Sequence, residues 1–381
     1  MNTSEIKYHV GLSAHLLSNQ PGYRQAGIHN YLTETLRHLP AASSEHDIRY
    51  SVYSSDSTIE YEPMLKVSSP AWSTASPIAR ILWEQLALPL KSVDLIHSTA
   101  FVSPLLSRRP SVVTVYDLSF IRFPEALPQT RKYYLSVLGR LSAQRARRVI
   151  TISEHSRDEI ANIWNVPVEK IEIAYPGVDP EFRILPIEKV QQFRTSQNLP
   201  ERFILHVGTL QPRKNLIRLI QAFNKLDNDI HLILVGAKGW YFDRIMSSIT
   251  ELGLQHRIHL LGFIPTEEMV KLYNAAELFA FPSLYEGFGM PVVEALACGT
   301  PVVASRSSSI PEAAGRDGTA TLFDPTNVDD IAYAMHNSLQ QNNNDPKVKE
   351  MRTNHTHKFT WMNTAQVHVS AYLRALGERD E

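Results

Sequence analysis

Two carboxylates, Glu286 and Glu294, flank a glycine-rich turn at the point where the sequence pattern changes from strand to helix. The preceding run 277–282 is a short apolar segment typical of a buried strand, and Pro291 suits the first turn of a helix. Unpaired backbone N–H groups at a helix start favour an anion such as phosphate, and a carboxylate accepts hydrogen bonds from hydroxyl groups. The pattern therefore indicates a site for a phosphorylated sugar, although a glycine-capped helix with two solvated glutamates would give the same spacing.

A second strand-to-helix junction carries two cations. The apolar run 203–207 ends at Gly208, and Arg213 and Lys214 precede apolar residues at helical spacing. The planar guanidinium fork and the ammonium point charge together could neutralise a diphosphate that also contacts the helix terminus. An Arg-Lys pair at a helix start is commonly a solvated face, but two such junctions in one half of the chain favour a shared ligand site.

Apolar strand-like runs alternate with amphipathic helical segments along the chain, which indicates parallel sheets covered by helices. The expected strands are 8–14, 48–53, 94–98, 111–116 and 148–153 in the front half, and 203–207, 231–236, 257–262, 278–281 and 301–304 in the back half. The turn-rich segment 174–186 predicts an interdomain linker. Because ligands of open parallel sheets bind at the carboxyl ends of strands, both junctions stand where a ligand site is expected.

The composition is that of an ordinary globular protein: 381 residues, 43% hydrophobic, 20% charged and a net charge of -1. That length accommodates two domains of about 150 to 200 residues each. The charge balance gives no overall drive toward nucleic acid, and the single Cys298 excludes a disulfide framework. The first residues lack the basic segment and apolar core of a signal peptide, and no run approaches the ~20 apolar residues of a membrane span, so we expect a cytoplasmic protein.

Three segments carry a family pattern: Gly208 with Arg213-Lys214-Asn215; Pro282-Ser-x-x-Glu286-Gly-Phe-Gly-x-Pro291-x-x-Glu294, continuing to Gly299-x-Pro301; and Thr114-Val-Tyr-Asp117-Leu-Ser-Phe. Together they resemble the large retaining glycosyltransferase family that includes bacterial mannosyltransferases and sucrose and glycogen synthases, usually called family 4. The resemblance spans nearly the whole chain. It implies the α/β GT-B fold, in which two Rossmann-like domains face each other across a cleft and a C-terminal helix crosses back to the first domain. The expected parts are an N-terminal acceptor-binding domain over 1–180, a C-terminal nucleotide-sugar-binding domain over 181–360, and the returning helix over 361–381.

The resemblance also implies roles for matching residues. Arg213 and Lys214 would hold the donor diphosphate, and Glu294 would hold the ribose. Glu286 and the backbone amides after it would hold the donor sugar. The base would lie against Phe263 and Ile264. The other expected donor contacts are Gly27, Gly208, Gly287, Phe288, Gly289, Met290 and Pro291, and the expected catalytic residues are Glu286, Asp117, Lys214 and Arg213.

The sequence departs from the family at Tyr116, where many relatives carry a histidine that reaches the reacting sugar. Tyrosine is neutral near pH 7, so any role of a charged imidazole is lost or moves to a neighbour. Asp117 could orient an acceptor hydroxyl or take its proton, or it could cap the following turn. His97 and His155 are further candidates, and each is also typical of a structural histidine.

The implied reaction is the metal-independent, retaining transfer of a hexose from a nucleotide-diphosphate sugar to a glycan or lipid-linked acceptor in surface polysaccharide synthesis. Mannose is our guess for the hexose, with GDP-mannose or a UDP-hexose as donor. No cofactor is expected, since no Asp-x-Asp pair follows a strand and no His/Cys cluster has zinc spacing. The alternatives are a non-catalytic nucleotide-sugar-binding protein, or an epimerase or phosphorylase of the same architecture.

Segment 130–148 adds a second property, because it carries six basic residues among apolar ones. Such a helix could dock peripherally on anionic lipid at the inner face of the membrane, or it could simply pack on the sheet as a surface helix.

Overall fold

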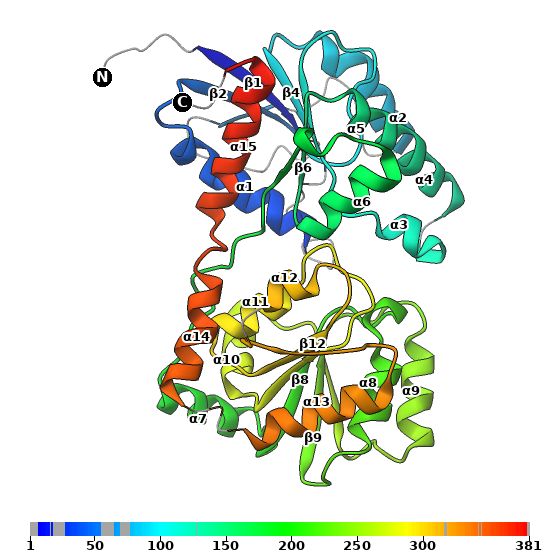
Figure 1. The fold of residues 1–381 in the computed structure, drawn as a ribbon, viewed down its shortest axis with the longest axis vertical. Helices are drawn as coiled ribbons and strands as arrows, with labels where there is room; N and C mark the ends of the chain where they lie inside the picture. Colours follow the sequence, from blue (N-terminus) through cyan, green and yellow to red (C-terminus); the bar gives the residue numbers. More distant parts are fainter. Residues whose placement is uncertain are drawn as a thin grey trace. The chain divides into compact units, whose positions relative to one another are not determined.

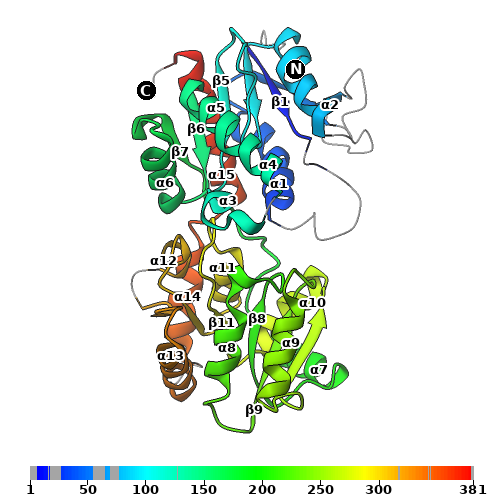
Figure 2. The same ribbon diagram turned by 90° about the vertical axis from the view of Figure 1, so that its right-hand side faces the viewer.

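The computed structural model describes residues 7–15, 17, 27–54, 65–68, 77–126, 128–315, 318–341, 343 and 345–378. The chain divides into two compact α/β units (Figures 1 and 2). The first comprises Met1–Gly177 with Phe359–Glu381, and the second comprises Val178–Lys358. Each unit is built on one sheet in which every strand pairing is parallel.

The first unit has a 7-stranded sheet in the order β3-β2-β1-β4-β5-β6-β7. Its strands are β1 (Tyr8–Ser13), β2 (Ile48–Tyr53), β3 (Leu65–Ser68), β4 (Leu95–Ser98), β5 (Ser111–Thr114), β6 (Arg148–Thr151) and β7 (Ile171–Ile173). Its helices are α1 (Ile28–Ala42), α2 (Pro77–Leu82), α3 (Ser119–Arg122), α4 (Gln129–Tyr134), α5 (Arg140–Arg145), α6 (Glu154–Trp164) and α15 (Trp361–Leu376). The sequence did not predict β3 and β7, because these edge strands are only four and three residues long.

The second unit has a 6-stranded sheet in the order β10-β9-β8-β11-β12-β13. Its strands are β8 (Arg202–Val207), β9 (Ile230–Val235), β10 (Ile258–Gly262), β11 (Leu278–Phe281), β12 (Val302–Ser305) and β13 (Thr321–Phe323). Its helices are α7 (Ile187–Ser196), α8 (Leu216–Phe223), α9 (Phe242–Glu251), α10 (Thr266–Ala275), α11 (Met290–Ala297), α12 (Ile310–Ala314), α13 (Val328–Gln340) and α14 (Pro346–Thr356). The short edge strand β13 and the strongly polar α14 were not predicted.

The strands are mostly apolar and largely buried because helices cover both faces of each sheet. In β8 the side chains of Phe203, Ile204 and Leu205 are completely buried. Helix α8 buries Leu216, Leu219, Ile220, Ala222 and Phe223, a 3.6-residue period that lays one stripe on the core. The two-sheet α/β fold predicted from the alternation is confirmed.

Helix α15 packs on α1 and on the sheet of the first unit, so the C-terminal helix returns to the first domain as the family resemblance implies. Arg374 binds both carboxylate oxygens of Glu172 on β7, at 2.7 and 2.8 Å. Gly177 lies against the first turn of α15, and a Cβ there would be 2.3 Å from the backbone nitrogen of Trp361. Only glycine permits this approach, at the point where the chain leaves the first unit.

A buried histidine pair lies between α15 and the sheet. His97 contacts the Tyr372 hydroxyl through Nδ1 and the Thr114 hydroxyl through Nε2, each at 2.8 Å. The His368 ring centroid lies 5.6 Å from that of His97, and its Nδ1 contacts the Thr364 carbonyl oxygen at 2.9 Å. Burial lowers the pKa of both rings, that of His368 to about 4, so both are neutral in the folded protein.

We expect His368→Gln to reduce the acid sensitivity of the fold. A histidine whose pKa falls to about 4 on folding contributes stability that is complete above its unfolded pKa of about 6.5 and is lost as pH falls, with a limit of about 3 kcal/mol. Urea unfolding at pH 7 and pH 5 measures the slope for each protein. Glu294 opposes this trend, since its pKa is raised to about 7, and His206 reinforces it, so the comparison is between variant and wild type. The exposed His357→Gln is the control, and an equal pH slope in wild type and His368→Gln would contradict the assignment.

Segment 130–148 is helical as far as Arg145, as the sequence predicted, but it contains a π-helical turn and leaves the helix at its end. Helix α4 ends at Tyr134, a π-helical turn follows over Leu135–Gly139, α5 ends at Arg145, and Arg148 already belongs to β6. The arginine-rich end is therefore a loop and a strand start. None of the helices in the described part of the chain is both long and apolar enough to cross a membrane.

Candidate active site

The second sheet has one topological switch point, between β8 and β11. Counted from its first strand, its order is 3-2-1-4-5-6, so the connections run in opposite directions from β8 and β11. In open parallel sheets a ligand binds outside the carboxyl ends of the strands at such a point. The loops that follow these two strands are 208–215 and 282–289, which are the two junctions that the sequence singled out.

Two glycines lie at the carboxyl ends of β8 and β9, beside the switch point. Gly208 donates its N–H to the Val235 carbonyl at 2.9 Å, and Gly236 donates to the Gly262 carbonyl at 2.8 Å, so the ends of β8, β9 and β10 are tied together. Gly208 and Gly236 have φ angles of +154° and +144°, and a Cβ on Gly236 would be 2.1 Å from the Gly208 oxygen. A Cβ on Gly208 would be 3.1 Å from Lys214 Cε. Glycine is required here because side chains would block both the loop contact and the path of Lys214.

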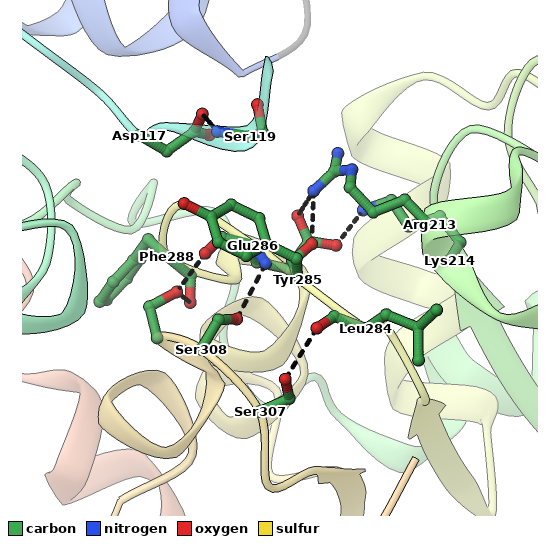
Figure 3. A network of polar contacts seen from close by, with 11 residues as sticks. Asp117, Ser119, Arg213, Lys214, Leu284, Tyr285, Glu286, Phe288, Ser307 and Ser308 are labelled. Atoms are coloured by element: carbon green, nitrogen blue, oxygen red, sulfur yellow. Dashed lines mark hydrogen bonds and ion pairs between the residues drawn. The ribbon is translucent and has the colours of Figure 1, made fainter. Parts of the chain in front are cut away.

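Three charged side chains meet at the switch point. Lys214 Nζ donates to Glu286 Oε1 at 2.6 Å, and Arg213 donates to Glu286 Oε2 at 2.7 Å (Figure 3). The same guanidinium donates to the Tyr285 carbonyl at 2.6 Å. Lys214 and Glu286 are only 7% and 8% exposed. The structure thus brings together three residues that the sequence placed in one site, 72 and 73 positions apart.

The electrostatics of this cluster favour an anion. Burial opposes ionisation of Glu286, but Arg213 and Lys214 outweigh it and lower the pKa of the carboxyl to about 2. Burial and the neighbouring Arg213 lower the pKa of Lys214, while Glu286 counteracts them. Two cations therefore face one carboxylate, and the excess positive charge suits a phosphate or diphosphate.

A serine run that the sequence analysis missed holds the loop after β11. Ser308 Oγ accepts the Glu286 N–H at 2.9 Å, and Ser307 Oγ donates to the Leu284 carbonyl at 2.7 Å (Figure 3). Ser309 Oγ donates to the carbonyls of Glu286 and Phe288. Ser308 has a φ of +52°, which a tight loop imposes. The signal was present as three consecutive serines before Pro311, but only the fold places them against Glu286.

Asn215 is a second residue whose role the sequence did not reveal. Its side-chain amide donates to the Pro282 and Pro325 carbonyls at 3.1 and 2.7 Å, and its φ of +59° turns the chain into α8. It therefore ties the Arg213-Lys214 turn to the loop that carries Glu286.

Helix α11 begins at Met290, where the sequence predicted a helix start, with Gly289 at φ +111° before it and Pro291 in its first turn. Glu294 lies one turn further and accepts a hydrogen bond from the Tyr273 hydroxyl at 2.9 Å. Burial raises the pKa of Glu294 to about 7, against the opposing effect of that hydrogen bond. Gly287 and Phe288 belong to the turn between Glu286 and α11.

The residues predicted to contact the base follow β10. Phe263 is 76% exposed and Ile264 is half-buried, so an aromatic face is open to solvent beside Gly262. In the first unit Gly27 precedes α1 with a φ of +67°, and among the described residues beyond its chain neighbours no atom lies within 4 Å of a Cβ added there. Residues 18–26, which precede Gly27 in the sequence, lie outside the described residues.

The side chains of Asp117 and Tyr116 make hydrogen bonds within the first unit. Asp117 Oδ1 accepts the Ser119 N–H at 2.8 Å, which is the turn-capping alternative (Figure 3). Tyr116 is 3% exposed, donates to the Thr99 carbonyl at 2.9 Å and packs against Tyr31. Tyr116 therefore fills the core. His97 is likewise a core residue.

His155 lies 3.7 Å from Glu159, one turn along α6. Within the described residues no three His, Cys, Asp or Glu side chains are grouped as metal ligands would be. Metal independence and the absence of a cofactor stay predictions.

Two Rossmann-like units with an anion-suited cluster at a switch point define a class of protein, the GT-B glycosyltransferases. Residues 188–357 match the family model "Glycosyl transferases group 1", and residues 26–182 match "Glycosyltransferase Family 4". The chain is 33% identical over 286 residues to the O-antigen chain mannosyltransferase B of Escherichia coli, an alignment that covers 72% of this chain and 73% of that relative. The chain belongs to the family 4, group 1 glycosyltransferases, and the family predicted from the motifs is confirmed.

Other comparisons agree. The serotype-specific mannosyltransferase WbdA of Escherichia coli is 28% identical over 262 residues, which is 67% of this chain but only 32% of WbdA. Among solved structures, Anabaena HepE in complex with UDP and glucose superposes with a TM-score of 0.72 at 20% identity, covering 97% of this chain and all of that one. Sucrose-phosphate synthase from Thermosynechococcus elongatus gives 0.76 at 21% identity, covering 97% and 99%. At these identities the structural likeness demonstrates the GT-B fold.

Proposed function

We propose that this glycosyltransferase is a retaining mannosyltransferase that extends a surface polysaccharide of the O-antigen type, with GDP-mannose as donor and without a divalent ion. The observation that carries the proposal is the Arg213–Glu286–Lys214 cluster at the switch point of the second sheet. The choice of mannose is supported by the relatives that bear mannosyltransferase names. The nucleotide-sugar class is supported by HepE, which was crystallised with UDP-glucose.

In the proposed reaction the bond between the anomeric carbon and the β-phosphate oxygen breaks, and a bond from the acceptor oxygen forms on the same face of the sugar. The acceptor proton passes to the departing diphosphate, so the products are the glycosylated acceptor and a nucleoside diphosphate. Negative charge grows on the leaving diphosphate, and Arg213 and Lys214 are fixed cations that would stabilise it. Their positions are set by Glu286 before any ligand binds, so little reorganisation is needed.

Glu286 has a further proposed role, as the group that holds the donor sugar together with the turn Gly287–Gly289. Glu294, whose pKa of about 7 leaves both protonation states accessible near neutrality, would hydrogen-bond the ribose hydroxyls. Phe263 would cover the base with its open face.

A nucleotide-sugar screen tests the proposal. We expect GDP and GDP-mannose to raise the melting temperature more than UDP, ADP and their sugars do, because a ligand that binds only the folded state stabilises it. Proton NMR of the product formed with a short mannan acceptor should show the anomeric configuration of the donor. An inverted product would contradict retention, and stabilisation by UDP-sugars alone would contradict the donor.

The burial of Tyr116 in the core favours one alternative, a nucleotide-sugar-binding protein without catalysis, since a tyrosine hydroxyl that already donates to Thr99 does not replace the usual histidine. Donor binding with neither transfer to pooled acceptors nor donor hydrolysis would support that alternative.

A further inference from the structure

One face of the first unit exposes an unusual concentration of large apolar side chains. Among the described residues of this unit, seven large hydrophobic side chains are exposed, and six of them belong to three segments on this face. The six are Leu82 (49%), Leu86 (56%), Leu90 (83%), Leu106 (81%), Tyr133 (71%) and Leu141 (44%), which we call the leucine face. The seventh is Val168 (51%). Such a cluster on a folded unit marks an interaction site.

Hydrogen bonds join the three segments on one side of the first unit. Gln85 donates to the Ser103 carbonyl at 3.1 Å and accepts the Leu105 N–H at 3.0 Å, so the helical segment with Leu82 and Leu86 lies against the loop that carries Leu106. The Ser103 N–H donates to Ser142 Oγ at 2.9 Å, which places Leu141 beside the same loop. Figure 1 shows α2, α4 and α5 along one side of the first unit, and Figure 2 turns that side to the viewer.

The segments that form the leucine face are also rich in positive charge. Residues 82–91, 105–109 and 131–141 contain six basic side chains, Lys91, Arg108, Arg109, Arg131, Lys132 and Arg140, and one acidic side chain, Glu84. Arg108, Arg109, Arg131 and Arg140 are exposed. Exposed leucines in segments that also expose arginines are typical of a surface that enters the boundary between lipid headgroups and acyl chains. A second copy of the chain is a poor occupant, because it would bring cations against cations.

We infer that the leucine face docks on the surface of an anionic bilayer. Leucines and Tyr133 enter the headgroup region, and the cations of the same segments contact lipid phosphates. The inference rests on the proposed function. A lipid-linked acceptor is presented at a membrane surface, and an enzyme that glycosylates it has to reach that surface. The surface differs from the helix that the sequence suggested, because most of its apolar contact comes from 82–90 and 105–106.

Vesicle sedimentation tests the inference. The full-length protein is mixed at low salt with vesicles of phosphatidylcholine, or of phosphatidylcholine with phosphatidylglycerol. The wild type should sediment with the anionic vesicles, and added salt should release it. A triple charge reversal, Arg108→Glu with Arg131→Glu and Arg140→Glu, should weaken the affinity for anionic vesicles on the order of a hundredfold. Each lost cation is expected to contribute at least about fivefold. The triple variant Leu86→Asp with Leu90→Asp and Leu106→Asp should lower the affinity for anionic vesicles by at least as much.

Matched controls carry the same change elsewhere. Val168→Asp alters the seventh exposed large apolar side chain among the described residues of the first unit, and Tyr333→Asp alters a side chain of the second unit that is 67% exposed. Both should bind vesicles like the wild type, and circular dichroism should show that every variant is folded. Wild-type binding by both triple variants, equal binding to neutral vesicles at high salt, or no binding of the wild type at low salt would each overturn the inference.

Two further readouts separate this inference from the proposed function and from self-association. Transfer to a water-soluble acceptor should be unchanged in the leucine-face variants, because none of these residues belongs to the candidate active site. Leucine-face variants that lose vesicle binding but keep transfer would support docking. A wild type that transfers the sugar but never binds vesicles would refute the docking inference and leave the proposed function standing. A dimer in light scattering that the leucine triple variant converts to a monomer, without vesicle binding, would identify a second copy as the occupant and overturn the lipid assignment.

Discussion

Lys214→Ala is expected to lower kcat/KM for glycosyl transfer by about a hundredfold to a thousandfold, the usual cost of removing one charge-stabilising donor from an active site. The Lys214 ammonium is buried beside Gly208 and lies 2.6 Å from Glu286, so no solvent cation takes its place. Initial rates with GDP-mannose and a mannan acceptor measure the effect. The fold should survive, since Glu286 keeps its 2.7 Å pair with Arg213.

Lys271→Ala is the matched control for that experiment. Lys271 also pairs with a glutamate at 2.7 Å, but Glu267 is 81% exposed on the surface of α10, where an ion pair contributes little. Its variant should keep wild-type kinetics and stability. A Lys214→Ala enzyme with a rate within a few-fold of the wild type would remove Lys214 from the proposed mechanism.

Glu286→Ala should abolish detectable transfer and also destabilise the second unit. Without the carboxylate, Lys214 is a buried cation next to Arg213 with no neutralising partner, and breaking a buried pair in this way costs about 3 to 5 kcal/mol. The loss has a pH signature in the wild type. Because the pKa of Glu286 is lowered to about 2, its stabilising contribution is present above about pH 4.5 and is lost as pH falls toward 2.

The double variant Glu286→Ala with Lys214→Ala distinguishes the two effects. Removing the buried cation together with its partner should restore part of the free energy of unfolding, while transfer stays absent. Chemical denaturation gives the coupling energy, with Glu267→Ala as the exposed control. A Glu286→Ala protein that unfolds within about 1 kcal/mol of the wild type would mean that the cluster is not the buried, coupled unit described here.

Much of the fold was readable from the sequence, and the reason is local. Strands such as 203–207 and 278–281 are short, mostly apolar runs typical of a buried parallel strand, and the turn Gly289–Pro291 favours the start of α11 through backbone preferences. The edge strands β3, β7 and β13 escaped prediction because three or four residues carry no periodicity. The helix predicted over 130–148 was wrong only at its end, since helical structure stops at Arg145 and Arg148 pairs in the sheet beside Val112.

By itself the sequence determined the family, the two-unit α/β architecture and the residue types of the candidate site, because motif spacing encodes turns and helix starts within a few residues. The tertiary structure decided what those residues face. It joined Arg213 and Lys214 to Glu286 across about seventy positions, set Ser308 against the Glu286 backbone, and turned Tyr116 into the core. It also gathered the leucine face from three separate segments. Such contacts depend on how strands are ordered in a sheet, and that order follows from burying the whole apolar surface at once.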